Sequence, residues 1–372
     1  PLDAEPDAAQ PDAAPPIPDR GPPHDFGAPD AAPPPPDADL RPPAAPTLAR
    51  HEVADAVDRQ AVCNDGTPAI YYLRAGRGVD ADRWVIHLQS GGECRTAEAC
   101  RQRAGLDPAY VTSSPRLHPD ARRFDGLFDP APGRNPDFFD WTHVVLVYCS
   151  SDRWLGDRPA SDGTGGYHLR GARILQAVLE DLRDPSVTLG PDLRRATDVL
   201  FTGTEAGAAG VRAHVDAVAA ALAPATVRGV VDGYAPDAAW IDVALSAKQA
   251  ADAEGHSFWI PALDTDCAAA EAASPWRCLG DEVGQAHVQT PCFVNQDQLD
   301  GPEPFDEARQ FGAAVRADLG RRTGAFSARV GQPIWLTNEV VHDAPVDGLV
   351  MHTVLANWLF GRPGPRTAIA EP

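Results

Sequence analysis

Apolar strand-like runs that alternate with helical patterns constrain the fold of this chain most strongly. Several of these runs are apolar throughout, which is expected when helices cover both faces of a sheet. The strand-like runs are AIYYLRA (69–75), RWVIHLQ (83–89), HVVLVYC (143–149), DVLFT (198–202), VRGVVD (227–232) and CFVNQ (292–296). Helical periodicity covers 170–182, 206–222, 238–250, 305–319 and 349–359. This order predicts an α/β fold with a mostly parallel, doubly wound sheet flanked by helices.

The first 47 residues differ in composition from the rest of the chain. They are rich in Pro, Ala and Asp, with almost no large apolar side chains. Such a segment buries too little surface to offset its chain entropy, so we predict a disordered spacer over 1–47. No second Pro/Gly-rich break divides 48–372, which we therefore expect to be a single domain. A spacer suits a protein held away from a surface. We expect that any leader has been removed and that a lipid anchor lies upstream of Pro1.

Charge and composition exclude several classes of partner and cofactor. The net charge of −21 argues against nucleic acid and against an anionic membrane surface, because both attract clustered Lys and Arg. The single lysine, Lys248, is interpreted as a result of genome composition. No apolar run approaches the roughly 20 residues that span a bilayer. The sequence has no His/Cys cluster with zinc spacing, no phosphate-binding or dinucleotide motif and no EF-hand loop, so neither metal nor cofactor is predicted.

One corner of the sequence resembles a catalytic turn with an unexpected residue. The run Val199-Leu200-Phe201 meets a Gly-rich corner and then a long Ala/Val-rich helical pattern. This layout is typical of a nucleophile elbow, in which G-x-S-x-G places a serine on a tight strand-to-helix turn. Here the corner reads GTEAG (203–207), with Glu205 where the serine would stand.

Two further loops follow apolar strands at the same expected edge of the sheet. HLQSGGEC (87–94) contains consecutive glycines that let backbone N–H groups approach a substrate, as an oxyanion hole requires. An ordinary Gly-rich turn has the same pattern. YCSSDRWLGD (148–157) is a polar loop after a buried strand. Trp154 in it suits a pocket wall or core packing equally, whereas Asp65 and Asp232 are interpreted as turn or network residues.

Together with CNDGTPAIYYLRAG (63–76), these loops resemble the pectin acetylesterase/Notum family of α/β-hydrolases. The similarity runs from about Ala61 to Trp358. Members carry a CNDG-S/T-P-A opening, a HLEGGGWC-like loop, a YCSSD loop and a G-S-S-A-G-G elbow. Later matches are VRGVVDG (227–233), WRC (276–278), VDG (346–348) and ANWLFGR (356–362). The chain resembles a divergent, bacterial-type member of this family.

The resemblance implies hydrolysis of carboxylic esters by a Ser, an Asp and a His. The serine position holds Glu205, the acid is retained as Asp300, and ungapped counting places Pro333 at the histidine position. The Trp of the glycine loop is replaced by Glu93. The oxyanion hole and pocket are expected to involve a set of residues around these positions: Gly91, Gly92, Glu93, Ser151, Asp152 and Ala206.

The resemblance also assigns the seven cysteines, whose pairing is ambiguous from spacing alone. It implies the bridges Cys63–Cys149, Cys94–Cys100 and Cys267–Cys278. Cys292 is left over and is interpreted as a small buried hydrophobe. Disulfides favour an oxidising compartment, so we predict a secreted, surface or periplasmic protein.

Two main hypotheses about function follow, besides a third, an interaction protein acting chiefly through its acidic Pro-rich arm, which rests on composition alone. The first is a catalytically degenerate hydrolase that serves as a binding or structural module, because Glu205 has no hydroxyl and Pro333 cannot transfer a proton. Its Glu205 carboxylate is predicted to occupy the oxyanion hole, held by N–H groups of Ala206, Gly91 and Gly92, with a depressed pKa. The alternative is an active esterase or deacetylase on acylated polysaccharide or lipid that uses rerouted groups. His342 and His352 are the candidate bases for that route.

Overall fold

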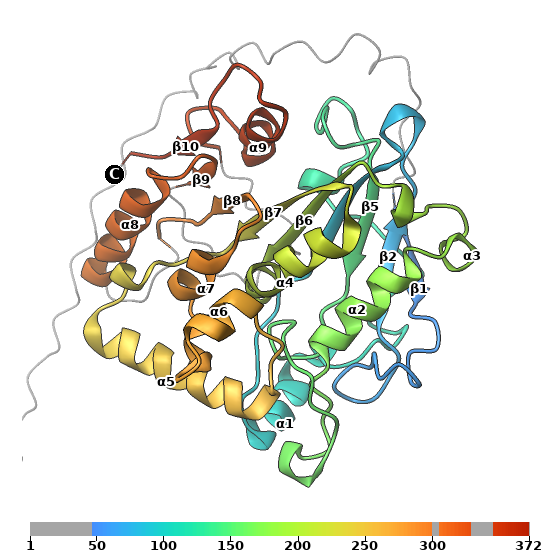
Figure 1. Ribbon diagram of the computed structural model, residues 1–372, viewed down its shortest axis with the longest axis vertical. Helices are drawn as coiled ribbons and strands as arrows, with labels where there is room; N and C mark the ends of the chain where they lie inside the picture. Colours follow the sequence, from blue (N-terminus) through green and yellow to red (C-terminus); the bar gives the residue numbers. More distant parts are fainter. Residues whose placement is uncertain (1–46, 300–304, 329–344, 372) are drawn as a thin grey trace, which may run out of the picture. The chain divides into compact units, whose positions relative to one another are not determined.

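The computed structural model describes residues 47–299, 305–328 and 345–371. Within these ranges a ten-stranded sheet forms the centre of the fold, in the order β10-β9-β8-β7-β6-β3-β5-β2-β1-β4 (Figure 1). The strands are β1 (Leu48–Glu52), β2 (Ile70–Arg74), β3 (Arg83–Leu88), β4 (Ala121–Arg122), β5 (Thr142–Leu146), β6 (Asp198–Thr204), β7 (Thr226–Asp232), β8 (Cys292–Asn295), β9 (Ala325–Ser327) and β10 (Thr367–Ile369). The α-helices are α1 (Ala97–Leu106), α2 (Gly171–Asp181), α3 (Pro185–Thr188), α4 (Ala206–Leu222), α5 (Asp242–Trp259), α6 (Thr265–Ala270), α7 (Asp281–His287), α8 (Phe305–Leu319) and α9 (Met351–Phe360).

The sheet is mixed, with its parallel part on one side. Strands β5, β3, β6, β7, β8, β9 and β10 pair in parallel, whereas β1 pairs with β2 and β4, and β2 with β5, in antiparallel fashion. The predicted α/β fold with a mostly parallel sheet is therefore confirmed, with an antiparallel extension at one edge. The six predicted strands and five predicted helices all correspond to elements of the structure.

Successive side chains of the central strands point to opposite faces of the sheet and pack into two separate cores. Trp84 and Ile86 of β3 pack under Ile174 of α2 and Val211 of α4. Val85, between them in sequence, packs on the opposite face. That face is covered by α9 and by a segment that contributes Phe124, Phe128 and Trp141. Because both faces are covered, the central strands are apolar throughout.

The register of the parallel strands brings four of their carboxyl ends level with one another. Leu88 at the end of β3 lies opposite Gly203 of β6. Thr204 lies opposite Asp232 of β7, and Asp232 lies opposite Asn295 of β8. The loops that follow β3, β6, β7 and β8 therefore meet at one edge, where ligands bind in sheets of this kind.

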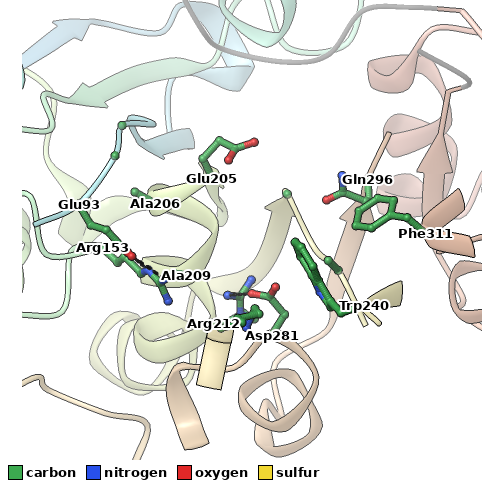
Figure 2. Close-up of a pocket in the computed structure, with 15 residues that line it drawn as sticks. Glu93, Arg153, Glu205, Ala206, Ala209, Arg212, Trp240, Asp281, Gln296 and Phe311 are labelled. Atoms are coloured by element: carbon green, nitrogen blue, oxygen red, sulfur yellow. Dashed lines mark hydrogen bonds and ion pairs between the residues drawn. The ribbon is translucent and has the colours of Figure 1, made fainter. Parts of the chain in front are cut away.

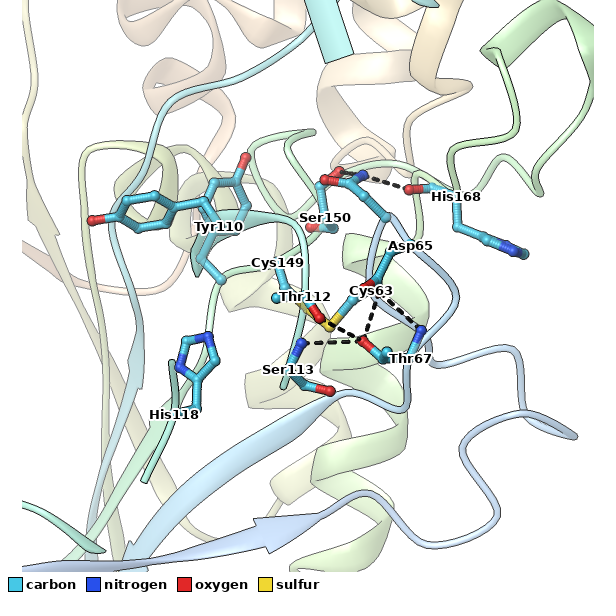
Figure 3. Close-up of a disulfide and its surroundings, with 12 residues drawn as sticks. Cys63, Asp65, Thr67, Tyr110, Thr112, Ser113, His118, Cys149, Ser150 and His168 are labelled. Atoms are coloured by element: carbon cyan, nitrogen blue, oxygen red, sulfur yellow. Dashed lines mark hydrogen bonds between the residues drawn. A yellow bond between two sulfur atoms is a disulfide. The ribbon is translucent and has the colours of Figure 1, made fainter. Parts of the chain in front are cut away.

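Three disulfides are present, and they join the cysteines that the family resemblance pairs: Cys63–Cys149, Cys94–Cys100 and Cys267–Cys278. The first ties the segment before β2 to the end of β5 across a sequence separation of 86 residues (Figure 3). Cys292 is a free, half-buried thiol, and burial raises its pKa to about 12. It is therefore an unreactive residue at the start of β8.

Two element boundaries differ from the sequence-based expectation. The helix expected over 238–250 spans Asp242–Trp259, because Asp237–Ala239 forms a separate 3₁₀ turn and the helix continues until Ile260 adopts a left-handed conformation. The strand expected over 143–149 ends at Leu146. The backbone beyond it turns to form the disulfide at Cys149. Strands β1, β4, β9 and β10 and helices α1, α3, α6 and α7 were not predicted from periodicity.

Candidate functional site

A pocket of about 400 Å³ lies at the carboxyl edge of the parallel strands (Figure 2). Each of the four loops that meet there contributes to it: Gly91 follows β3, Glu205 follows β6, Gly233 follows β7 and Gln296 follows β8. The remaining lining residues are Gly92, Glu93, Arg153, Ala206, Ala209, Arg212, Ala235, Trp240, Lys248, Asp281 and Phe311.

The turn at Glu205 has the strained backbone of a nucleophile elbow. Glu205 adopts φ 57° and ψ −112°, directly between β6 and α4. A carbon added at Gly207 would lie 2.0 Å from the carbonyl oxygen of Leu88, so only glycine lets α4 approach β3 this closely. Non-glycine residues in this region cost about 1–3 kcal/mol and persist only where their surroundings enforce the conformation. The backbone geometry of an elbow is thus present, with Glu205 at its tip.

A polar network at the strand ends holds the elbow. The backbone N–H of Glu205 donates to the carbonyl oxygen of Asp232 at 2.8 Å. The Asp232 carboxylate accepts from Thr204 Oγ1 at 3.0 Å and from Asn295 Nδ2 at 2.6 Å. One buried aspartate therefore ties together the ends of β6, β7 and β8. This confirms its interpretation as a network residue, and Asp65, which accepts from the N–H and hydroxyl of Thr67, is likewise a turn residue (Figure 3).

The predicted site residues fall into three groups. Glu205, Ala206, Gly91, Gly92 and Glu93 line the pocket together. Ser151 and Asp152 do not line it. Asp300 and Pro333, the acid and histidine positions, and His342 lie outside the described residues. His352 lies on α9, whose buried residues belong to the core on the face of the sheet opposite α4.

Ser151 and Asp152 serve the scaffold instead of the pocket. Both are fully buried. The Ser151 hydroxyl donates to Asn64 Oδ1 at 2.7 Å, and Arg103 Nε donates to that hydroxyl at 2.9 Å. Asp152 accepts from Ser150 Oγ and from two backbone N–H groups at the start of α2 and at Trp154. Trp154 is itself fully buried, which decides between its two interpretations in favour of packing.

The carboxylate of Glu205 does not cap the helix that follows it. Helix α4 has no side-chain cap hydrogen bond at its N-cap, Glu205. Figure 2 shows the side chain extending away from Ala206 and Glu93. The anchoring of this carboxylate by the N–H groups of Ala206, Gly91 and Gly92 stays a prediction.

A chain of largely half-buried ion pairs forms one wall of the pocket. Arg153 donates through Nη2 to Glu93 at 2.9 Å and through Nη1 to Asp252 at 2.9 Å. Lys248 Nζ lies 3.4 Å from the other oxygen of Asp252. Burial alone would raise the pKa of Glu93, but Arg153 and Arg95 outweigh it and hold that pKa below its usual value. Glu93 is therefore ionised at neutral pH.

The floor of the pocket combines a second ion pair with two aromatic rings. Arg212 of α4 pairs through Nη2 with Asp281 at the start of α7. Burial alone would raise the pKa of Asp281, but Arg212, Lys248 and Arg153 lower it. Trp240 packs edge-on against Phe311 with ring centroids 5.7 Å apart.

Sequence reasoning missed most of this charged lining. Arg212, Trp240, Asp281 and Phe311 lie in no recognisable motif, and Arg153 belongs to the loop 148–157 but was not singled out within it. Arg212 shares a helix with the elbow seven residues after Glu205, two turns along the same face, which is a usable signal. A second signal was that Lys248 is the single lysine of the chain. In the structure this residue lines the pocket. Its attribution to genome composition overlooked this position.

Within the described ranges, no group of three or more His, Cys, Asp or Glu side chains could hold a metal ion. No helix in the described part of the chain has the length and apolarity to cross a membrane.

Residues 45–303 match the pectinacetylesterase family. The chain belongs to this family. It is 27% identical over 328 residues to the palmitoleoyl-protein carboxylesterase NOTUM of Drosophila melanogaster, with 82% of this chain and 48% of that protein covered. It is 30% identical over 161 residues to pectin acetylesterase 11 of Arabidopsis thaliana, with 43% and 39% covered. The chain thus spans about half the length of the first curated relatives it matches, or 48% of the Drosophila protein.

A solved structure supports the same assignment. The crystal structure of the Wnt deacylase Notum from Drosophila superposes with a TM-score of 0.73 at 26% identity, covering 88% of this chain and 97% of that chain. The α/β-hydrolase fold implied by the family resemblance is therefore confirmed. The family is one of esterases by name, and this member carries Glu205 at the elbow.

Proposed function

We propose that this protein is a pectin acetylesterase/Notum-family member that has lost serine-esterase chemistry and acts by binding a polar ligand in its pocket. The observation that carries the proposal is the carboxylate of Glu205 on an intact, strained elbow. A serine mechanism needs a hydroxyl nucleophile and a base that takes its proton. Glu205 supplies no hydroxyl, and sequence counting places a proline at the position of the base, Pro333.

The character of the pocket supports a polar ligand over a fatty acyl chain. The relatives named palmitoleoyl-protein carboxylesterases act, by name, on a long apolar acyl group. Such a chain needs an apolar lining, because charged side chains lose solvation when hydrocarbon covers them. The lining here includes Glu93, Arg153, Arg212, Lys248 and Asp281. Of the ligands considered, a polar or glycan-like group fits this lining better than a lipid.

The disulfides support a location outside the cytoplasm. Three bridges in one domain form and persist in oxidising compartments. We therefore propose a secreted, surface or periplasmic protein. A lipid anchor, which the Pro-rich segment suggests, would attach it to a membrane.

One observation favours the alternative, an active esterase with rerouted groups. Backbone strain at Glu205 is retained, and strain of this kind clusters at functional sites. A carboxylate at an elbow can act as a nucleophile. It would attack the ester carbonyl, release the alcohol and form a mixed anhydride, which water would cleave with the help of a base.

Ester hydrolysis by purified protein separates these functions. We expect the unmodified protein to hydrolyse p-nitrophenyl acetate no faster than buffer. Glu205→Ser alone should remain inactive, because loss of either nucleophile or base costs about 10⁶-fold in subtilisin. Glu205→Ser combined with Pro333→His should restore turnover if Asp300 still serves as the acid. Activity of the unmodified protein that disappears in Glu205→Gln would favour the alternative.

A further inference from the structure

The floor of the pocket contains buried hydrogen-bond donors that have no acceptor among the described residues. Arg212 is only 5% exposed. Its Nη2 donates to Asp281, but its Nη1 is buried and has no hydrogen-bond partner among the described residues. A buried guanidinium nitrogen without a partner is costly, because its N–H has lost contact with water and gained no acceptor in return.

A second unused donor lies in the same floor. The Nε1–H of Trp240 is buried and likewise has no partner in the described part of the chain. Its ring is held edge-on by Phe311, at a centroid distance of 5.7 Å, so the indole cannot turn freely to find one. Both Arg212 and Trp240 line the pocket. Figure 2 shows them on its floor, with Asp281 between the two side chains.

Lys248 adds a cation with donors to spare. Its Nζ carries three N–H donors, and among the described residues it donates to Asp252 at 3.4 Å. Asp252 also accepts from Arg153 Nη1, so this carboxylate is shared by two cations. Lys248 therefore has N–H donors that its contact with Asp252 does not use.

The N–H groups of Arg212, Trp240 and Lys248 would be satisfied by a ligand that carries hydrogen-bond acceptors. Hydrogen bonds from guanidinium or ammonium groups are strongest to anionic oxygens, and roughly twice as strong as neutral ones. We propose that the pocket floor binds an oxyanion, a carboxylate or phosphate carried by a small polar ligand, with Arg212 Nη1 and Trp240 Nε1–H as donors and Lys248 as a supporting cation. This inference rests on the proposed function in one respect, namely that the pocket holds a polar ligand.

Asp281 has a positioning role in this arrangement. It stays ionised because three cations lower its pKa, and it takes Nη2 of Arg212. Held in this way on one side, the guanidinium leaves Nη1 as the donor that is available to a ligand. Glu205 lies on the same pocket lining and disfavours an anion close to the elbow, so we assign the oxyanion to the floor.

Calorimetric titration of the full chain with three matched probes tests the proposal. Glucose, glucuronate and glucose 6-phosphate share one ring and differ at C6, which carries a hydroxyl, a carboxylate or a phosphate. We expect at least one of the two anions to bind at least about tenfold more tightly than glucose. The preferred anion identifies which oxyanion the floor accepts.

Variants then locate the binding. Trp240→Phe removes only the N–H and keeps a ring against Phe311, and Arg212→Gln removes the cation. Each should weaken anion binding about tenfold and narrow the difference in affinity between the anions and glucose. Arg228→Gln is the matched control, because it removes an arginine from β7 that does not line the pocket and should leave the affinity unchanged. Should Arg212→Gln fail to fold, Trp240→Phe still decides.

The outcomes separate this inference from the proposed function. Equal affinity for all three probes, or equal loss in Arg228→Gln, overturns the oxyanion site. Ester hydrolysis measured on the same preparation tests the proposed function independently. If the protein hydrolyses the ester and also prefers an anion, the proposed function is wrong and the oxyanion site is supported. If it neither hydrolyses the ester nor prefers an anion, the proposed function is supported and the oxyanion site is wrong.

Discussion

Two loops at the same edge of the sheet show how similar motifs can have different physical roles. The loop Cys149–Asp152 follows β5, and the elbow Gly203–Gly207 follows β6, with β3 between the two strands. In the first loop, the side chains of Cys149, Ser150, Ser151 and Asp152 all bond to the scaffold. In the second, the Glu205 side chain faces the pocket while the backbone carries the strain.

The difference shows that a loop's hydrogen bonds, more than its sequence motif, reveal its role. Buried polar groups that find all their partners inside the protein hold the structure in place. Polar groups that line a cavity with donors to spare are available to a ligand. The first loop should therefore determine stability, and the second should determine what the protein binds.

Removal of the Cys63–Cys149 bridge should have the largest effect. It closes a loop of 86 residues, so the double variant Cys63→Ser/Cys149→Ser should lose about 4–5 kcal/mol of unfolding free energy by the loop-entropy relation. The matched control Cys94→Ser/Cys100→Ser opens a loop of 6 residues and should lose about 2 kcal/mol. Denaturant unfolding measures both. Equal losses would contradict the assignment of the first loop as the principal constraint.

Gly207→Ala should be the next most damaging change and tests the packing beneath the elbow. The added carbon would meet the carbonyl oxygen of Leu88 at 2.0 Å, so β3 and α4 must separate. We expect a loss of about 3 kcal/mol or more, as for other overpacked cores. The control is Gly105→Ala near the end of α1, where a new carbon meets nothing and should stabilise by about 0.5 kcal/mol. A harmless Gly207→Ala would refute the tight elbow.

The Asp152 carboxyl should make stability depend on pH. Burial raises its pKa from the usual 3.8 to about 6. The folded state therefore holds this proton more tightly, so the stabilisation is complete below about pH 4 and is lost as pH rises through 6, by up to about 3 kcal/mol. Unfolding measured from pH 4 to 7 should show this decline in the unmodified protein and a shallower one in Asp152→Asn. Parallel profiles would contradict a buried, proton-binding Asp152.

The smallest effect concerns the strain at Glu205. Glycine tolerates φ 57° without steric cost, whereas alanine keeps the strain of glutamate. Glu205→Gly should therefore be more stable than Glu205→Ala by about 1 kcal/mol, after the greater chain entropy of glycine is subtracted. Thermal unfolding of the pair measures this difference. If Glu205→Ala were the more stable variant, the elbow would not be strained.

More of the scaffold than of the pocket could be predicted from the sequence. The parallel strands and α4 follow from apolar runs and 3.6-residue periodicity, which depend only on local sequence. The family resemblance supplied the three disulfides and placed Glu205 at the elbow. It also suggested Ser151 and Asp152 as pocket residues, whereas their partners Asn64 and Gly171 are far away in sequence and could not be foreseen.

The charged lining was hidden for a related reason. Arg153, Arg212, Lys248 and Asp281 come from four separate segments, and only the closure of the fold brings them together. A short edge strand such as β10, three residues long, is equally hard to predict, because its pairing with β9 and not its own pattern defines it.

Turnover of p-nitrophenyl acetate by the unmodified protein, measured beside Glu205→Gln, tests the central claim most directly. If the elbow has kept its geometry and lost its reactive group, both proteins should match the buffer rate from pH 5 to 9. A rate well above buffer in the unmodified protein that Glu205→Gln abolishes would show that this carboxylate performs the chemistry, and would contradict the account.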